Sequence, residues 1–123
     1  SGRDFTWYRA DHEDNLPVAF DPRWRLAFVP PGFELRLSER RSMPTSSEAP
    51  VEHQMYSDGL AAVSVYVSNA DSEAMHFEGL SRMGAFSAFG RVVAGHQVVV
   101  VGQVPPQAVT RMAESLTWPE EAQ

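Results

Sequence analysis

The residues that could do chemistry lie in two short segments. His53 is followed by Ser57 and Asp58, the residue types of a nucleophilic hydrolase site. Near the start of the chain, His12 and Glu13 offer imidazole and carboxylate groups to a divalent cation. The four histidines include no pair at the i, i+4 spacing of a helical metal site, and the chain has no cysteine. A solvated acidic segment around His12 is therefore the favoured interpretation of that stretch.

Ser57 and Asp58 also begin a β-turn that Gly59 completes. Asp-Gly between two strand-like segments is a strong signal for a hairpin, and Ser and Asp side chains in such turns bond to the local backbone. This structural role explains both residues better than catalysis does. Glycine-rich phosphate-binding loops at dinucleotide or Walker spacing are absent. We therefore predict no catalytic residue, no metal site and no cofactor.

The strand that follows the turn alternates, with valine at positions 63, 65 and 67 and polar or small residues between them. A two-residue loop would place polar side chains opposite this valine stripe. A three-residue loop at 57–59 pairs His53 with Val63 and Met55 with Ala61, so we predict that register and a buried His53. The outward row would then carry Gln54, Tyr56, Ser64, Tyr66 and Ser68. Tyrosine among small polar residues suits contacts with another protein.

Four further strands and one helix complete the predicted fold. Residues 24–29 and 33–37 alternate like short strands, and residues 85–93 and 96–104 predict a second hairpin. A helix follows from about residue 106 and ends at Pro119. The sequence thus predicts an α+β domain, with an antiparallel sheet of about five strands built from two hairpins plus one strand, packed by one C-terminal helix. Residues 71–84 fit a short helix or a loop over the sheet edge.

The valine run at 98–101 has no polar alternation, which is typical of a central strand covered on both faces. The C-terminal helix is the candidate cover for one of these faces. Its predicted apolar stripe consists of Val109, Met112, Ala113 and Leu116.

Composition limits the classes of partner. The chain has 123 residues, enough for one domain, and a net charge of −6, which argues against nucleic acid. No apolar run is long enough to span a membrane. Residues 23–43 nevertheless carry five arginines against two glutamates. Arg36, Arg40 and Arg41 could therefore form a face that binds carboxylates, or a solvated strand with intramolecular partners.

Four motifs together give the chain a family resemblance. They are VPPGFEL at residues 29–35, YSDGL at 56–60, MGA at 83–85 and VGQVPP at 101–106. In this combination and order they resemble the C-terminal domain of the RseB/MucB family. The resemblance covers about residues 24–118 and divides the chain into a linker at 1–23, the domain at 24–118 and a tail at 119–123. The linker would connect to an N-terminal domain that is missing here.

The resemblance implies a function. RseB/MucB proteins are non-enzymatic, periplasmic negative regulators of an envelope-stress sigma factor in Gram-negative bacteria. They bind the periplasmic segment of a membrane anti-sigma factor of the RseA or MucA type and protect it from site-1 proteolysis. Their own N-terminal domain senses lipid, and it is a second expected partner. From the exposed positions of the predicted sheet we expect partner contacts at Tyr56, Ser64, Tyr66, Arg36, Arg40 and Arg41.

One alternative function and one further mode of binding stay open as hypotheses. A lipid- or envelope-ligand-binding module is the alternative function, and it needs an apolar cavity between sheet and helix. One helix and this sheet should just cover each other, so we expect no such cavity. A sheet with an unpaired edge can also accept an extended peptide as an additional strand.

Overall fold

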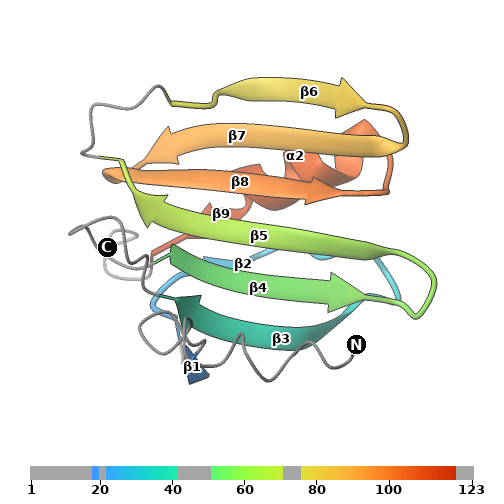
Figure 1. Cartoon of the computed structure of the whole chain (residues 1–123), viewed down its shortest axis with the longest axis horizontal. Helices are drawn as coiled ribbons and strands as arrows, with labels where there is room; N and C mark the ends of the chain where they lie inside the picture. Colours follow the sequence, from blue (N-terminus) through green and yellow to red (C-terminus); the bar gives the residue numbers. More distant parts are fainter. Residues whose placement is uncertain (1–17, 20–21, 42–50, 71–75, 119–123) are drawn as a thin grey trace, which may run out of the picture.

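One twisted antiparallel sheet forms the body of the domain (Figure 1). The computed structural model describes residues 18–19, 22–41, 51–70 and 76–118, so the predicted tail and most of the predicted linker, His12 included, lie outside the described residues. The order of strands across the sheet is β1-β3-β4-β5-β8-β7-β6. The strands are β1 (Val18–Ala19), β3 (Glu34–Arg41), β4 (Val51–Ser57), β5 (Ala62–Asn69), β6 (Gly79–Met83), β7 (Phe86–Val93) and β8 (His96–Gly102).

Two smaller elements cover one face of this sheet, which we call the inner face. They are the helix α2 (Pro106–Glu114) and a two-stranded pair of β2 (Arg25–Leu26) with β9 (Leu116–Thr117). In Figure 1 both lie behind the large sheet. The side chains buried between the layers form one apolar core, and its members are Trp24, Val63, Val65, Val67, Val98, Val100, Val109, Met112, Ala113, Leu116 and Trp118. The predicted stripe of Val63, Val65 and Val67 is therefore confirmed, and so is the helix stripe except for Leu116, which is buried but lies in β9. In the run at 98–101 only Val98 and Val100 are buried, so the predicted cover on both faces is not found among the described residues.

The helix ends earlier than predicted. It stops at Glu114, and the chain then turns into β9 instead of continuing toward Pro119. Ser115 makes the turn, because its hydroxyl donates to the carbonyl of Met112 at 2.9 Å and accepts the amide of Phe28 at 3.1 Å. The strand predicted at 24–29 is also shorter, because only β2 at Arg25–Leu26 is extended. This short strand pairs with β9 and does not join the large sheet.

The predicted register of the β4–β5 hairpin is wrong. Tyr56 pairs with Val63 and His53 with Tyr66, so the loop has four residues, 58–61, instead of three. The Asp58 carboxylate sets this loop by accepting the amides of Leu60 and Ala61, each at 2.9 Å. The change turns β4 over, because successive side chains of a strand point to opposite faces. His53 therefore lies on the outer face.

Replacement of Asp58 by asparagine tests this account of the loop. Hydrogen bonds from the amides of Ala61 and Leu60 lower the pKa of the Asp58 carboxyl below its ordinary value of 3.8. The folded state thus favours the ionised Asp58 carboxylate. The stabilisation that this carboxylate gives is complete above pH 3.8 and is lost as the pH falls through the lowered pKa. We expect wild type to be slightly more stable than Asp58→Asn at neutral pH, and the difference to vanish in acid. Urea unfolding of both proteins between about pH 2 and pH 7 measures it. A difference that persists unchanged in acid contradicts the account.

A bulge in β3 breaks the predicted alternation of its leucines. Leu35 pairs with Tyr56 and Leu37 with Met55, so two steps along β3 match one step along β4. Leu35 therefore lies on the inner face and Leu37 on the outer face. Both are exposed, whereas the sequence predicts a half-buried strand.

Residues 79–83 form a seventh strand where a helix or a loop was expected. β6 pairs with β7 along its whole length, from Gly79 opposite Gly90 to Met83 opposite Phe86. Phe77 precedes it and is held by Gln97, whose side chain bonds to both the amide and the carbonyl of Phe77. Residues 71–75 lie outside the described residues. The predicted α+β class, an antiparallel sheet packed by one C-terminal helix, is confirmed. Within the described residues the sheet has seven strands, counting the two-residue β1, where about five were expected.

Candidate functional site

A hydrogen-bonded cluster occupies the outer face at the centre of the sheet. The imidazole of His53 contacts the Glu39 carboxylate through Nδ1 at 3.1 Å and the Ser64 hydroxyl through Nε2 at 3.0 Å. Its ring stacks on Tyr66, with 4.4 Å between ring centroids. Glu39 is nearly buried. The register of β3, β4 and β5 brings these four residues into adjacent positions.

The cluster has the acid–imidazole–hydroxyl order of a serine hydrolase, but it lacks what that chemistry needs. Ser64 lies in β5, which pairs with β4 on one side and β8 on the other, so the surrounding backbone amides belong to the sheet ladders. Among the described strands, the amides beside Ser64 are therefore not available to stabilise an oxyanion. The earlier hydrolase candidate also fails, since the Ser57 hydroxyl bonds to the carbonyl of Ala61 and not to His53. The described contacts of His53 with Glu39 and Ser64 join β3, β4 and β5.

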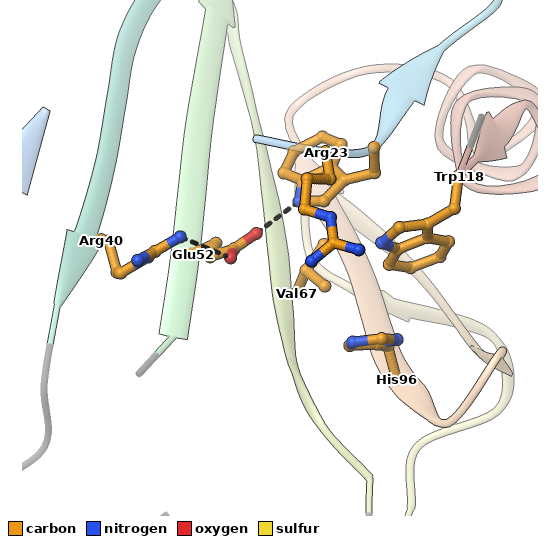
Figure 2. A pocket seen from close by; sticks show the side chains of 7 residues that line it. Arg23, Arg40, Glu52, Val67, His96 and Trp118 are labelled. Atoms are coloured by element: carbon orange, nitrogen blue, oxygen red, sulfur yellow. Dashed lines mark hydrogen bonds and ion pairs between the residues drawn. The ribbon is translucent and has the colours of Figure 1, made fainter. Parts of the chain in front are cut away.

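A charged hollow of about 250 Å³ lies on the inner face, at the end where β3 stops and β4 begins. Glu52 joins its two sides, accepting the indole N–H of Trp24 at 2.5 Å and pairing with Arg40 at 3.4 Å. Figure 2 shows the Arg23 side chain entering the hollow between Glu52 on one side and Trp118 and His96 on the other. His96 stacks on Trp118, with ring centroids 4.5 Å apart.

The charged side chains that line this hollow carry a net positive charge. Arg23 and Arg40 outnumber the single carboxylate of Glu52 among the residues that line it. A site of this kind can accept a carboxylate or a carbonyl oxygen. Both arginines, however, already interact with other groups of the protein.

A second hollow of about 280 Å³ lies beside the first on the inner face, and Trp24 lines both. Tyr56 and Leu35 contribute apolar surface to it. The Tyr56 hydroxyl donates to the side chain of Gln54 at 2.5 Å. Burial raises the pKa of this phenol, an effect that nearby Arg25 partly opposes. Both hollows are smaller than about 300 Å³, the lower bound for typical small-molecule pockets, so neither supports the lipid-binding alternative.

The six residues predicted to contact a partner lie in different places. Ser64 and Tyr66 are on the outer face, as expected, whereas Tyr56 lies on the inner face because of the changed register. Arg40 also lines the inner hollow, and Arg36 is exposed, with a long 3.9 Å ion pair to Glu34. The side chain of Arg41 lies outside the described part of the structure. The six residues thus form no single patch among the described positions.

The sequence interpretation missed Glu39, Glu52 and Trp24 as organising residues. Glu52 could have been predicted from the polar residues of β4 that lie opposite the valine stripe. The two-residue-loop alternative placed polar side chains opposite that stripe, and the observed register does the same.

The described residues offer neither a metal site nor a membrane-spanning helix. They contain no cluster of three or more His, Asp or Glu side chains that could hold a metal ion. None of the helices in this part of the chain is both long and apolar enough to cross a membrane.

Comparison with known families decides the relationship. A family model described as the MucB/RseB C-terminal domain matches residues 19–117. The chain belongs to this family. The resemblance of the four sequence motifs to this family is therefore confirmed.

Curated relatives of this MucB/RseB C-terminal domain are named as regulatory proteins. The chain is 34% identical over 95 residues to the sigma-E factor regulatory protein RseB of Salmonella typhimurium, covering 77% of this chain and 29% of that protein. It is 35% identical over 103 residues to the sigma factor AlgU regulatory protein MucB of Pseudomonas aeruginosa, covering 80% and 32%. The chain thus spans about a third of the length of these relatives. Regulatory names agree with the expectation that the chain is not an enzyme.

Solved structures of MucB share the fold. A crystal structure of MucB in complex with MucA(peri) superimposes with a TM-score of 0.64 at 31% identity, covering 80% of this chain and 37% of that one. The complex of MucA and MucB from Pseudomonas aeruginosa gives a TM-score of 0.64 at 32% identity, covering 81% and 35%.

Proposed function

We propose that this MucB/RseB C-terminal domain is a non-enzymatic regulatory module that acts in the periplasm. It binds the periplasmic part of a membrane anti-sigma factor of the MucA type. By occupying an extended segment of that partner, it shields the segment from the site-1 protease and so keeps envelope-stress signalling off.

The observation that carries this proposal is the likeness to MucB solved with its partner. That MucB is bound to MucA(peri), and its fold matches this chain over 80% of the chain at 31% identity. Because the chain covers only about a third of the relatives, the second partner expected from the resemblance, a lipid-sensing N-terminal domain, also belongs to the proposal.

The predicted contact residues stay a prediction, and the five whose side chains are described lie in three places. Ser64 and Tyr66 present the outer face, while Arg36 and Arg40 lie along β3. Tyr56 is half-buried on the inner face and offers little surface to a partner.

Calorimetric titration tests the proposed function. The 123-residue chain is titrated with the periplasmic part of MucA, and with a scrambled peptide of the same composition as the control. We expect saturable binding to the first and none to the second. Protection of the MucA segment from the site-1 protease by the bound chain is the second measurement. Absence of binding to the MucA segment overturns the proposal for this chain.

A further inference from the structure

The two ends of the large sheet differ in how their outer strand is protected. Natural sheets guard their edges with charged side chains, bulges or a short covering strand, because an open edge pairs with other chains. At one end, β3 has all three protections. It contains the bulge between Leu35 and Leu37, carries charged residues along its length, and pairs with β1 at Glu39 and Arg40.

The other end of the sheet, β6, has almost none of these protections. β6 closes the strand order, pairs with β7 on one side only, and shows a regular register without a bulge. Figure 1 shows it as the outermost strand, on the side opposite β1. Its sequence is Gly-Leu-Ser-Arg-Met, with one charge and no proline. The outward backbone groups of β6 therefore have no strand partner among the described residues.

Apolar side chains surround this open edge. Leu80 is 51% exposed, Met83 64% and Phe86 46%. Met83 and Phe86 pair across β6 and β7 on the outer face, whereas Leu80 lies on the inner side, opposite Phe89. An added strand next to β6 would cover apolar surface on both faces of the sheet while it completes the backbone ladder.

We propose that the β6 edge, Gly79–Met83 with the side chains of Leu80, Met83 and Phe86, binds the partner as an additional β-strand. The occupant is an extended segment of the periplasmic part of the anti-sigma factor, with apolar side chains opposite Leu80 and Met83. This inference rests on the proposed function and adds the surface and the mode of binding. A backbone ladder explains how a protected segment is held extended and out of the reach of a protease.

A second copy of the chain is the less suitable occupant. The protein carries a net charge of −6, so two copies repel each other at low ionic strength. An antiparallel pairing of two β6 strands about Ser81 would also place Arg82 of each copy opposite the exposed Leu80 of the other. Such a pair leaves the apolar surface of Leu80 without an apolar neighbour.

The test combines a double variant with amide exchange, using the 123-residue chain and the periplasmic part of MucA as the probe. Leu80→Lys with Met83→Lys places charges at the edge, and both positions are exposed enough to keep the fold. Leu60→Lys is the matched control, because Leu60 is 96% exposed in the β4–β5 loop. We expect binding by the double variant to weaken by about tenfold or more and binding by the control to change by less than about twofold. Amides of residues 79–83 should exchange more slowly in the complex.

The outcomes separate this inference from the proposed function. If wild type does not bind the MucA segment, the proposed function falls, and this inference falls with it. If wild type binds but the double variant binds equally well, or residues 79–83 exchange at an unchanged rate, only the strand-addition inference is overturned. Protection of residues 79–83 that rises with protein concentration without MucA would assign the edge to a second copy, and it would overturn the inference too.

Discussion

Replacement of Trp24 by alanine is expected to lower the free energy of unfolding by about 3 to 5 kcal/mol. Trp24 is 2% exposed and belongs to the apolar core, so its removal leaves a large cavity under the sheet. The indole N–H also donates to Glu52, so the variant removes one partner of a carboxylate that joins β4 to the β2 segment. Because domains of this size are stable by only about 5 to 15 kcal/mol, the variant should be close to unfolding.

Urea denaturation followed by far-UV circular dichroism measures the effect of the Trp24 substitution. Trp24→Phe keeps one six-membered aromatic ring but loses the N–H donor and the volume of the second ring, so we expect an intermediate loss of about 1 to 3 kcal/mol. Leu60→Ala serves as the control for a large apolar residue without a core role, with an expected change within about 0.5 kcal/mol. If Trp24→Ala and Leu60→Ala unfold at the same urea concentration, the β2 segment is not part of the core.

Replacement of Gly102 by alanine is expected to destabilise the domain by about 3 kcal/mol, which is large for one methyl group. A Cβ atom at this position would lie 2.5 Å from the carbonyl oxygen of Ala62 and 2.9 Å from the Cα of Val63. Both atoms belong to the backbone of β5, so no side chain can move aside. The start of β5 and the end of β8 would have to separate, and these two strands are neighbours in the middle of the strand order.

Gly95→Ala provides the matched comparison for Gly102→Ala. Gly95 has open space around it and a φ of +79°, so its substitution costs only the left-handed backbone conformation, about 1 kcal/mol. Chemical denaturation of the two variants side by side measures the difference. Equal losses would show that the approach of β5 to β8 relaxes without cost, contrary to the expectation.

The sequence predicted those parts of the fold whose structure follows from the local spacing of apolar residues. The alternation of Val63, Val65 and Val67 is local and strong, and all three valines are buried. The helix stripe that contains Val109 and Met112 is equally local, and it too packs into the core. In both elements one face is buried in the core, and the spacing of the apolar residues along the sequence shows which face that is.

The parts that were missed depend on contacts between segments. The register of β4 follows from two backbone amides that bond to Asp58, and a loop longer by one residue changed the face of Tyr56 and His53. The Glu39–His53 contact also depends on the bulge in β3, which no alternation pattern contains. β6 was missed because an edge strand buries little of either face, so its apolar residues need not alternate. The same lack of burial leaves the β6 edge open.

The short β2–β9 pair has a mechanical consequence. Arg25 pairs with Thr117 and Leu26 with Leu116, so the chain enters β2 next to the point at which it leaves β9. A force that pulls these two points apart acts across the pair and opens its bonds one after another, as an unzipping load, instead of shearing them all at once. The core residue Trp24 lies directly at the loaded end, so the first resistance to such a force comes from its packing and not from the ladder.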